Sequence, residues 1–473
     1  MKAQIDGKFD ALWKRMCRYP VSEGEAASTL REWAEQMGVT VQFSGLTQVG
    51  RFQPTLAIVL ATPEREACFP LSSPEAELRW QQNLEASNQE ALLWEKVEWF
   101  GPLWVPRANT MPLLQDVKYR GREEAIALFD YHMSTVYTVP FQAVCIAQLL
   151  PKSRSLSGFV PLLREAYLAF YSGYKAASIA ALIPVFEGAI KKISGASASA
   201  HVSHEIDRIF ERACMLAADL HYDGRWVPDS YRTVDYLFGQ DELIFVFETY
   251  KRWLKNSFFQ DTTKYDGATW LNRHLFAHGV SSQWQQMTNF SRLIVSLATL
   301  GVIESWHDDS NQVSLFFPAM DENGTLLWQQ ALLRASHQMW LKDHELKEFQ
   351  KHGRLVPELS SDDGLLLRTA RLMEGCMNDV VRPMRDAGWS VSVGEPESNA
   401  LYVVVSGSSG DVFLHVALLF SCATDNKIYK ELSETVDVVV YMGAPYHQQS
   451  YAFGVDIHVG PAAGWQPPKA PDR

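Results

Sequence analysis

A run of amphipathic helical patterns between residues 157 and 304 constrains the fold of this chain more than any other feature. Apolar side chains recur there every three or four residues, which places them on one face of each helix. The segments with this pattern are 161–193, 205–220, 241–258, 269–278 and 288–304. We expect the first segment to bend near Pro184, because proline removes a helical hydrogen bond. Helices with one apolar face bury it against each other, so the pattern predicts an all-α bundle at the centre of the chain.

The residues before the bundle, 1–150, predict a mixed α/β domain. A helical segment over 23–37 ends at Gly38, and glycine is typical of the position just beyond a helix C-terminus. Strand-like apolar runs follow at 39–43 and 55–60. We find no catalytic motif in this part of the sequence, so it predicts a fold without predicting a role.

The residues directly after the bundle, 305–363, predict a connecting region. An apolar run at 313–317 favours a short strand, and the Asp-Glu-Asn-Gly run at 321–324 favours a turn. A helical pattern over 326–349 predicts one long helix. The connection is therefore expected to be built largely from that helix.

The last part of the chain, 364–460, predicts a C-terminal α/β domain. A helical pattern extends from residue 364 to about residue 386 and precedes three apolar runs of strand length. The expected strands are 400–406, 412–420 and 436–442. The tail, 461–473, is rich in proline and has little to bury, so we expect it to be disordered. Together these patterns predict an α+β multidomain protein in which mixed α/β domains flank a central helical bundle.

Length and composition restrict the class of protein. A chain of 473 residues exceeds the roughly 250–300 residues at which single cores stop growing, so several domains are expected. No apolar run approaches the roughly 18–20 residues of a membrane helix, and we expect neither a membrane span nor a secretory signal. The six cysteines are dispersed and form no Cys-x-x-Cys pair, which indicates reduced residues in the cytoplasm. The net charge of −12 argues against a broad basic surface for duplex binding but allows a local cationic cleft.

The nine residues from Leu271 to Gly279 hold the side chains best suited to chemistry. Arginine binds a phosphate through a planar fork of N–H donors, and histidine exchanges protons near neutral pH. His274 and His278 are four residues apart and lie on one side of a helix, whereas roughly 140° separates Arg273 from His278. Gly279 indicates that the helix ends directly after His278. Because Arg273 and His278 point to different sides of the helix, a second copy of the chain can complete a site around them more easily than one chain alone.

This stretch resembles the motif of the HEPN superfamily, whose ribonuclease members carry Arg, then Asn, Asp or His, then a short spacer and His. Arg273, His274 and His278 match that order. Residues 167–193 resemble the long early helix of HEPN-like proteins from bacterial defence and abortive-infection genes, and 287–290 resembles the start of their next helix. The resemblance covers the central bundle, less than a third of the chain, and does not extend to either flank.

The resemblance implies a metal-independent endoribonuclease that acts as a homodimer and uses no cofactor. It makes His278 the general base or acid at the RNA 2′-OH or the leaving 5′-oxygen, and Arg273 the group that stabilises charge on the phosphate. It also implies that His274 orients this pair or contacts the phosphate, and that Glu187 anchors Arg273 or polarises a histidine. Attack by the 2′-OH would cut RNA, spare DNA and leave a 2′,3′-cyclic phosphate. The bacterial subgroup implies a toxin-like effector in anti-phage defence.

Basic residues near the motif are candidates for RNA binding. They are Lys251, Arg252, Lys255 and Lys264. These side chains could form the local cationic cleft that an acidic RNA-binding protein needs. A solvated helix face is the other interpretation of the same charges.

Other interpretations of the motif stay open. Arg273 can bridge Glu187 across the bundle, and His278 can stabilise a helix end through the helix dipole, without chemistry at either residue. The main alternative function is a catalytically inactive HEPN module that binds RNA or a protein partner. A scaffold whose flanking domains recognise a protein or phage-derived trigger is another. Two histidines four residues apart suit zinc, but no third ligand is evident beside His274 and His278, so no metal site is predicted.

Overall fold

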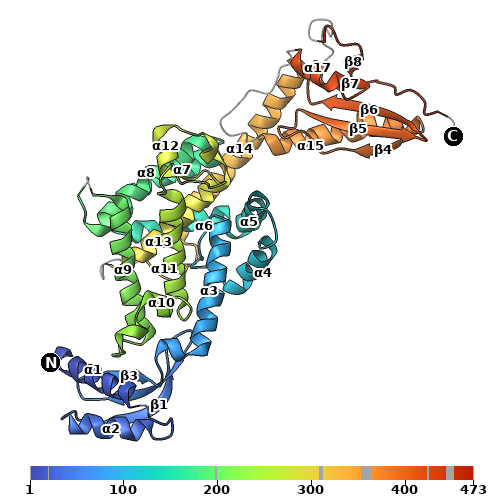
Figure 1. Ribbon diagram of the computed structural model, residues 1–473. Helices are drawn as coiled ribbons and strands as arrows, with labels where there is room; N and C mark the ends of the chain where they lie inside the picture. Colours follow the sequence, from blue (N-terminus) through green and yellow to red (C-terminus); the bar gives the residue numbers. More distant parts are fainter. Residues whose placement is uncertain are drawn as a thin grey trace. The chain divides into compact units, whose positions relative to one another are not determined.

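The computed structural model describes residues 2–19, 21–197, 200–307, 313–352, 364–422, 426–443 and 452–471 (Figure 1). Contacts within the chain divide it into two compact units. The first unit is Met1–Phe170 with Lys175–Gln330, and the second is Tyr171–Tyr174 with Ala331–Arg473. Each unit has its own β-sheet and its own hydrophobic core. The architecture is therefore mixed α+β, as predicted.

The first unit begins with a three-stranded antiparallel sheet. Its elements are α1 (Lys2–Arg18), α2 (Ala26–Gln36), β1 (Phe43–Val49), β2 (Thr55–Ala61) and β3 (Glu66–Pro70). The strands pair in the order β1-β2-β3. Both helices pack against the sheet through a shared core that includes Phe9, Leu30 and Ile58. Gly38 follows α2 with φ +70°, the left-handed conformation that glycine adopts without a steric penalty.

The first strand lies later in the chain than the sequence predicts. The expected strand was 39–43, whereas β1 starts at Phe43, which pairs with Ala61. Val39 and Val41 are buried in the core between the helices and the sheet. Their apolar character therefore reflects burial before the strand and not strand pairing.

Helices form the rest of the first unit, and α13 lies at their centre. The longer elements are α3 (Leu78–Lys96), α4 (Arg107–Val117), α5 (Arg122–Val136), α6 (Val139–Val144), α7 (Val160–Tyr171), α8 (Lys175–Ser194), α9 (Val202–His221), α10 (Val234–Leu237), α11 (Glu242–Trp253), α12 (Arg273–His278), α13 (Thr288–Ser305) and the start of α14 (Glu322–His352). Short 3-10 or π-helical turns are η1 (Pro74–Ala76), η2 (Cys145–Leu149), η3 (Leu150–Lys152), η4 (Ser157–Phe159), η5 (Asp229–Tyr231), η6 (Leu254–Phe258) and η7 (Gln283–Gln285). Almost every side chain of α13 from Asn289 to Glu304 is buried, and α13 packs against α5, α6, α8 and α9 (Figure 1).

The helix predicted over 161–193 is two helices, α7 and α8. The chain breaks between them at Gly173, whose φ of +95° is accessible to glycine and costly for other residues. Pro184, where a bend was predicted, lies inside α8. The patterns over 205–220 and 288–304 are confirmed as α9 and α13.

The predicted boundary near residue 150 lies inside the first unit. Helix α3 packs against α11, and α6 and η2 pack against α13. Helices from 1–150 and from 157–304 therefore share one core, which sequence periodicity alone does not reveal.

The connecting region differs from its prediction at two places. Residues 313–317 form no strand; Phe317 instead stacks on Phe141 with ring centroids 4.3 Å apart. The predicted turn at 321–324 is the first turn of α14, because the Asp321 side chain accepts a hydrogen bond from the Gly324 N–H at 2.8 Å. Residues 353–363 of this region lie outside the described residues.

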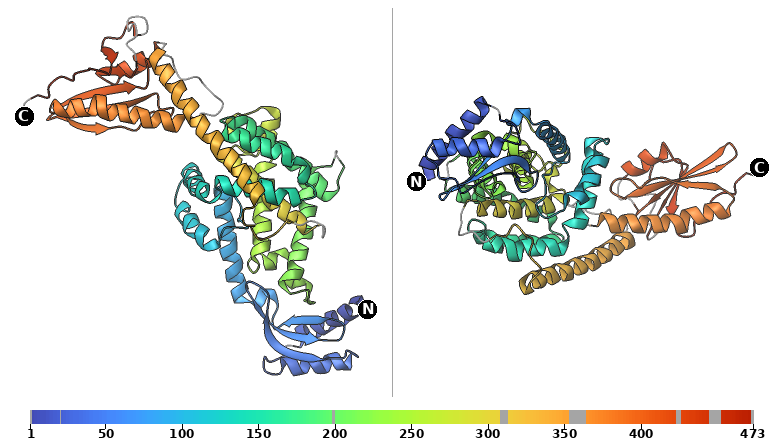
Figure 2. Two further views of the ribbon diagram at one scale, coloured as in Figure 1. Left: turned by 180° about the vertical axis from the view of Figure 1, so that it is seen from behind. Right: turned by 90° about the horizontal axis from the view of Figure 1, so that it is seen from below.

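The second unit contains a five-stranded sheet with helices on both faces (Figure 2). Its elements are α15 (Leu365–Gly375), η8 (Cys376–Val381), α16 (Arg382–Asp386), β4 (Ser390–Val393), β5 (Tyr402–Ser409), β6 (Val412–Leu419), α17 (Lys427–Ser433), β7 (Val438–Tyr441) and β8 (His458–Pro461). The order is β4-β5-β6-β7-β8, antiparallel from β4 to β6 and parallel from β6 to β8. Leu372 and Met384 pack on one face, and Tyr429 and Leu432 on the other. The three strands predicted here are confirmed.

The tail that we expected to be disordered is packed against the second unit as far as residue 471. β8 pairs with β7. Trp389 donates its indole N–H to the Pro468 carbonyl at 2.8 Å, and Ala470 N–H donates to the Ala387 carbonyl at 2.8 Å. The prolines leave few donors in this segment, but its carbonyls are used as acceptors.

None of the described helices alone has the length and hydropathy of a membrane span. One consecutive pair, Arg122–Val136 with Val139–Lys152, reaches both only in combination and is bent by 69°.

Candidate active site

Asn272 decides where helix α12 begins. Its side-chain oxygen accepts hydrogen bonds from the backbone N–H groups of His274 (2.9 Å) and Leu275 (3.1 Å), as an N-cap does. Its amide nitrogen donates to the carbonyls of Ser257 (2.8 Å) and Gln260 (2.9 Å). Asn272 is fully buried. One side chain therefore both starts the helix and ties it to the end of η6.

Gly279 ends α12, as predicted. Its φ of +61° is left-handed, and its N–H donates to the Phe276 carbonyl at 3.2 Å. His278 is the last helical residue and is exposed. The helix expected over 269–278 is shorter than predicted because Asn272 caps it.

Glu187 on α8 binds two cations next to α12. Its Oε2 accepts from Arg273 Nη2 at 2.7 Å, and its Oε1 accepts from Lys191 Nζ at 2.8 Å. The Arg273 and Glu187 side chains are 30% and 26% exposed, so water reaches this pair. The Lys191 ammonium and then the Arg273 guanidinium lower the pKa of Glu187 despite its partial burial. Glu187 is therefore an anionic anchor for Arg273 at neutral pH.

The two histidine rings of α12 lie nearly parallel. The ring centroids of His274 and His278 are 6.4 Å apart, and the ring planes differ by 10°. Arg273 Nη1 lies 3.5 Å from His274 Nδ1. Partial burial, followed by the charges of Arg273 and His278, lowers the pKa of His274. His274 is therefore neutral near pH 7 and able to accept a proton, while His278 faces solvent.

Three of the basic residues proposed to bind RNA are engaged in ion pairs. Lys255 Nζ contacts both carboxylate oxygens of Asp207 at 2.8 Å, and Lys251 Nζ lies 3.5 Å from the same carboxylate. Arg252 lies 3.7 Å from Glu95. The positive charges of these three residues are therefore compensated, and the three do not form an uncompensated cationic cleft. Their contact with RNA stays a prediction.

Lys264, the fourth residue, is exposed in the turn before the motif. Asp261 in the same turn accepts from the Thr263 N–H (2.8 Å) and hydroxyl (2.6 Å). These bonds, and then the charges of Lys264 and His274, lower the pKa of Asp261. The turn therefore presents one cation and one carboxylate near α12.

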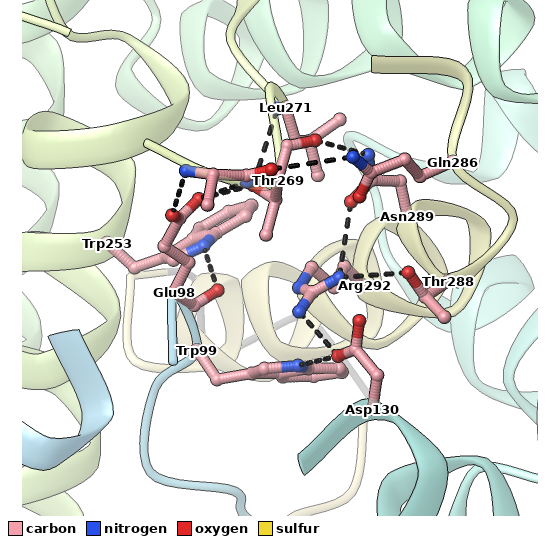
Figure 3. A network of polar contacts seen from close by, with 11 residues as sticks. Glu98, Trp99, Asp130, Trp253, Thr269, Leu271, Gln286, Thr288, Asn289 and Arg292 are labelled. Atoms are coloured by element: carbon pink, nitrogen blue, oxygen red, sulfur yellow. Dashed lines mark hydrogen bonds and ion pairs between the residues drawn. The ribbon is translucent and has the colours of Figure 1, made fainter. Parts of the chain in front are cut away.

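A buried carboxylate holds the loop that leads into α12. Glu98 is 1% exposed and accepts from the backbone N–H groups of Ala268 (2.6 Å) and Thr269 (3.2 Å) and from the Thr269 hydroxyl (Figure 3). Arg122 Nη2 lies 3.3 Å from the same carboxylate. Glu98 has φ +52°, a conformation that costs energy for a residue with a side chain. Several charged hydrogen bonds offset that cost and fix the loop.

A second chain of polar contacts holds the same loop from α13. Asn289 Nδ2 donates to the carbonyls of Thr269 and Trp284, both at 2.9 Å, and so closes the segment that contains α12. Arg292 donates to the Asn289 side-chain oxygen at 3.3 Å and forms an ion pair with Asp130 (Figure 3). The Arg292 and Asp130 side chains are 1% and 8% exposed. A buried network of polar side chains, Asn289, Arg292 and Asp130, therefore holds the loop before the motif in place.

These supporting residues were not predicted from the sequence. Asn272 carries a recognisable signal, because asparagine is a preferred N-cap and stands directly before the motif. Glu98 carries none, since its partner Ala268 is 170 positions away. The partners Arg292 and Asp130 are 162 positions apart. Long-range ion pairs of this kind have no local pattern.

Neither a metal-binding group nor a known relative helps to interpret the site. Among the residues that the structure describes, no group of three or more His, Cys, Asp or Glu side chains could hold a metal ion. No protein-family model matches the chain, and no significant match was found among curated proteins or solved structures. The site is therefore interpreted from its own geometry and from the motif.

Proposed function

We propose that this chain is a metal-independent endoribonuclease of the HEPN type that acts as a homodimer on RNA. One observation carries the proposal. Helix α12 combines a carboxylate-anchored guanidinium (Arg273), a neutral histidine (His274) and an exposed histidine (His278) within a single, doubly capped turn and a half. These are the groups that cleavage of a phosphodiester requires when no metal takes part.

Arg273 binds the phosphate in this proposal. Its Nη2 bonds to Glu187, and a guanidinium has five N–H donors, so the anchored group keeps donors for a phosphate. These donors stabilise the negative charge that develops on the non-bridging oxygens. Glu187 fixes the orientation of Arg273 and takes no part in proton transfer.

The histidines move the protons. His278 takes the proton of the 2′-OH, the 2′-oxygen attacks phosphorus, and the bond to the 5′-oxygen breaks. The leaving 5′-oxygen receives a proton, and the products are a 2′,3′-cyclic phosphate and a 5′-OH. In a dimer, His278 of one copy acts beside Arg273 of the other, and it returns its proton to the leaving 5′-oxygen. His274 orients the exposed ring or contacts the phosphate.

The biological role that we propose is a toxin-like effector in anti-phage defence, located in the cytoplasm and released by a protein or phage-derived trigger. This part of the proposal rests on the resemblance of the motif and its flanking helices to the bacterial defence subgroup. The alternative is an inactive HEPN module that binds RNA or a protein partner. The ion pairs of Lys251 and Lys255 with Asp207 favour that alternative, because they leave less positive charge for a long RNA substrate.

RNA cleavage in the presence of EDTA tests the proposal. We expect the purified protein to cut RNA and leave a cyclic phosphate, but not to cut an RNA with 2′-O-methyl groups throughout. His278→Ala is expected to abolish cleavage without changing the melting temperature. His201→Ala, which removes another exposed histidine, serves as the matched control. Unchanged cleavage by the His278→Ala protein would reject the site.

Mixing two inactive variants tests the dimer. Arg273→Ala retains His278, and His278→Ala retains Arg273. If a site takes its arginine from one copy and its histidine from the other, the mixed dimer contains one intact site. We then expect cleavage to return on mixing and subunit exchange. Activity that stays absent in a verified mixed dimer shows that each chain needs its own pair.

A further inference from the structure

A cavity of about 740 Å³ lies within the first unit, and none of the proposed catalytic residues lines it. The turn between β1 and β2, helix α3, residues 101–110, the C-terminal end of α9 and the start of α11 form its walls. Sites for small molecules have volumes of roughly 300–1,000 Å³ and mostly apolar linings with a few polar groups. The cavity has the size of such a site.

Aromatic side chains supply much of the lining. Phe238 and Phe245 lie with ring centroids 5.2 Å apart on one wall. Trp104 and Phe317 lie with ring centroids 5.5 Å apart on another, and the Trp104 indole N–H is used by a hydrogen bond to a backbone carbonyl. Flat, apolar walls of this kind favour a planar ligand that can stack.

Buried polar side chains also line the cavity, and two of them, Glu90 and Gln240, bear on the ligand. Glu90 is 4% exposed; it accepts a hydrogen bond from the Trp94 indole N–H at 3.3 Å and pairs with Arg107. Gln240 is 5% exposed, and its side-chain amide makes no hydrogen bond to any residue that the structure describes. Gln240 therefore offers a donor and an acceptor to a ligand, and Glu90 offers a carboxylate acceptor in the same lining.

Neighbouring charges narrow the class of ligand. Arg107 neutralises Glu90, so the cavity does not need a cation. The lining carries the cations Arg51 and Arg107 beside the carboxylates of Glu90, Asp241 and Glu242, so its charge favours neither a cation nor an anion. Asp241 is already used, because it pairs with His221 at 2.8 Å and caps α11. The Gln240 amide and the Glu90 carboxylate thus remain among the hydrogen-bonding groups for a neutral ligand.

We infer that this cavity binds the base of a free nucleoside, a neutral planar heteroaromatic ring with N–H donors beside an acceptor. The ring stacks between the aromatic walls. Its edge donates to Glu90 and exchanges a donor and an acceptor with the Gln240 amide. The inference does not depend on ribonuclease activity, since the cavity and α12 have no residue in common.

Calorimetric titration with the four ribonucleosides tests the inference, with the full-length chain as the protein. We expect at least one nucleoside to bind at submillimolar concentration. Gln240→Leu and Glu90→Gln should each weaken binding about tenfold, because the first removes a hydrogen-bonding partner and the second replaces a charged acceptor by a neutral one. Glu95→Gln is the matched control: it lies on α3 and faces an arginine, but it does not line the cavity. Binding to that control should be unchanged.

Other ligands and a cavity-filling variant sharpen the test. Val246→Trp places bulk in the cavity and should abolish binding while all polar groups remain. Choline and inorganic phosphate should not bind. The inference is overturned if no nucleoside binds, if choline or phosphate binds instead, or if indole binds equally well to the wild type and both polar variants. Nucleoside binding by His278→Ala should equal that of the wild type, which keeps this result separate from the fate of the proposed nuclease.

Discussion

Two arginine–carboxylate pairs in the first unit consist of the same kinds of charged group but differ in how far their side chains are buried. Arg292 and Asp130 have side chains that are 1% and 8% exposed and lie under the loop that leads into α12. Arg273 and Glu187 have side chains that are 30% and 26% exposed and lie on α12 and α8. The buried pair connects to Asn289 and the loop, whereas the half-exposed pair contacts Lys191 and a histidine.

This difference in burial indicates which of the two arginines a ligand can reach. A buried charge that loses its partner is left in a medium that solvates it poorly, so the Arg292 pair is held in place. A half-exposed pair contributes little to stability, and water reaches both of its partners. The first pair therefore holds the loop in place, whereas the second leaves donors of Arg273 accessible, in the proposed function to a phosphate. Four predictions test this difference, in decreasing order of the effect that we expect.

Breaking the buried pair should have the largest effect. Asp130→Ala leaves Arg292 without its counter-charge and should lower the free energy of unfolding by about 3–5 kcal/mol. Urea titration followed by circular dichroism measures the change. Asp116→Ala, which removes an exposed partner of Arg120, is the control and should change the free energy of unfolding little. A loss as small as that of the control would remove the distinction between the two pairs.

Glu98→Gln should have an intermediate effect. The substitution keeps the shape but replaces the charged acceptor of the Ala268 and Thr269 N–H groups, so we expect a loss of about 1–3 kcal/mol. We also expect RNA cleavage to fall, because the loop before α12 is no longer fixed. Glu95→Gln, three residues earlier, should leave both the urea midpoint and cleavage unchanged. Full cleavage by a clearly destabilised Glu98→Gln protein would show that this loop does not position the motif.

Glu187→Gln should alter stability by no more than about 1 kcal/mol, because water reaches the pair. RNA cleavage should nevertheless fall, since Arg273 loses the charge that orients it. Glu35→Gln removes the partner of Arg31 in an exposed pair and should leave cleavage at the wild-type rate. The contrast between the two arginine pairs fails if Glu187→Gln destabilises the protein as much as Asp130→Ala.

The smallest expected effect is on pH dependence. The pKa of His274 lies below its ordinary value of 6.5 in the folded chain, so the unfolded chain binds more protons as pH falls through 6.5. Stability from this residue is therefore lost as pH falls below 6.5 and is complete above it. Urea midpoints at pH 7.5 and 5.5 should differ more for the wild type than for His274→Gln. Equal differences would mean that the pKa of His274 is not lowered.

Local patterns predicted the parts of the fold that depend on local forces. The apolar spacing of α9 and α13, the end of α12 at Gly279 and the strand β6 all follow from residues close in sequence. The sequence predicts one helix with a bend near Pro184, whereas the structure has two helices, α7 and α8, that separate at Gly173 with its left-handed φ. Proline keeps φ near −65°, a value that a helix also uses, whereas a left-handed φ ends the helical path.

Errors occurred where distant residues decide the outcome. Residues 313–317 have strand-like composition, but Phe317 stacks on Phe141 and no strand forms. The tail after residue 460 lacks an apolar pattern, yet β8 and the Trp389 indole hold it. The sequence around Lys251 and Lys255 predicts a basic surface. In the folded chain Asp207, on another helix, pairs with both lysines and neutralises them.

The sequence by itself determined the helical core, the motif on α12 and the glycine that ends it, because amphipathic spacing and helix caps act between neighbours. Only the tertiary structure decided which charges are compensated, how Glu98 and Arg292 fix the motif loop, and where the cavity beside Glu90 and Gln240 lies. These features depend on contacts between distant residues, 48 positions apart for Lys255 and Asp207 and 170 for Glu98 and Ala268, which exist only in the folded chain.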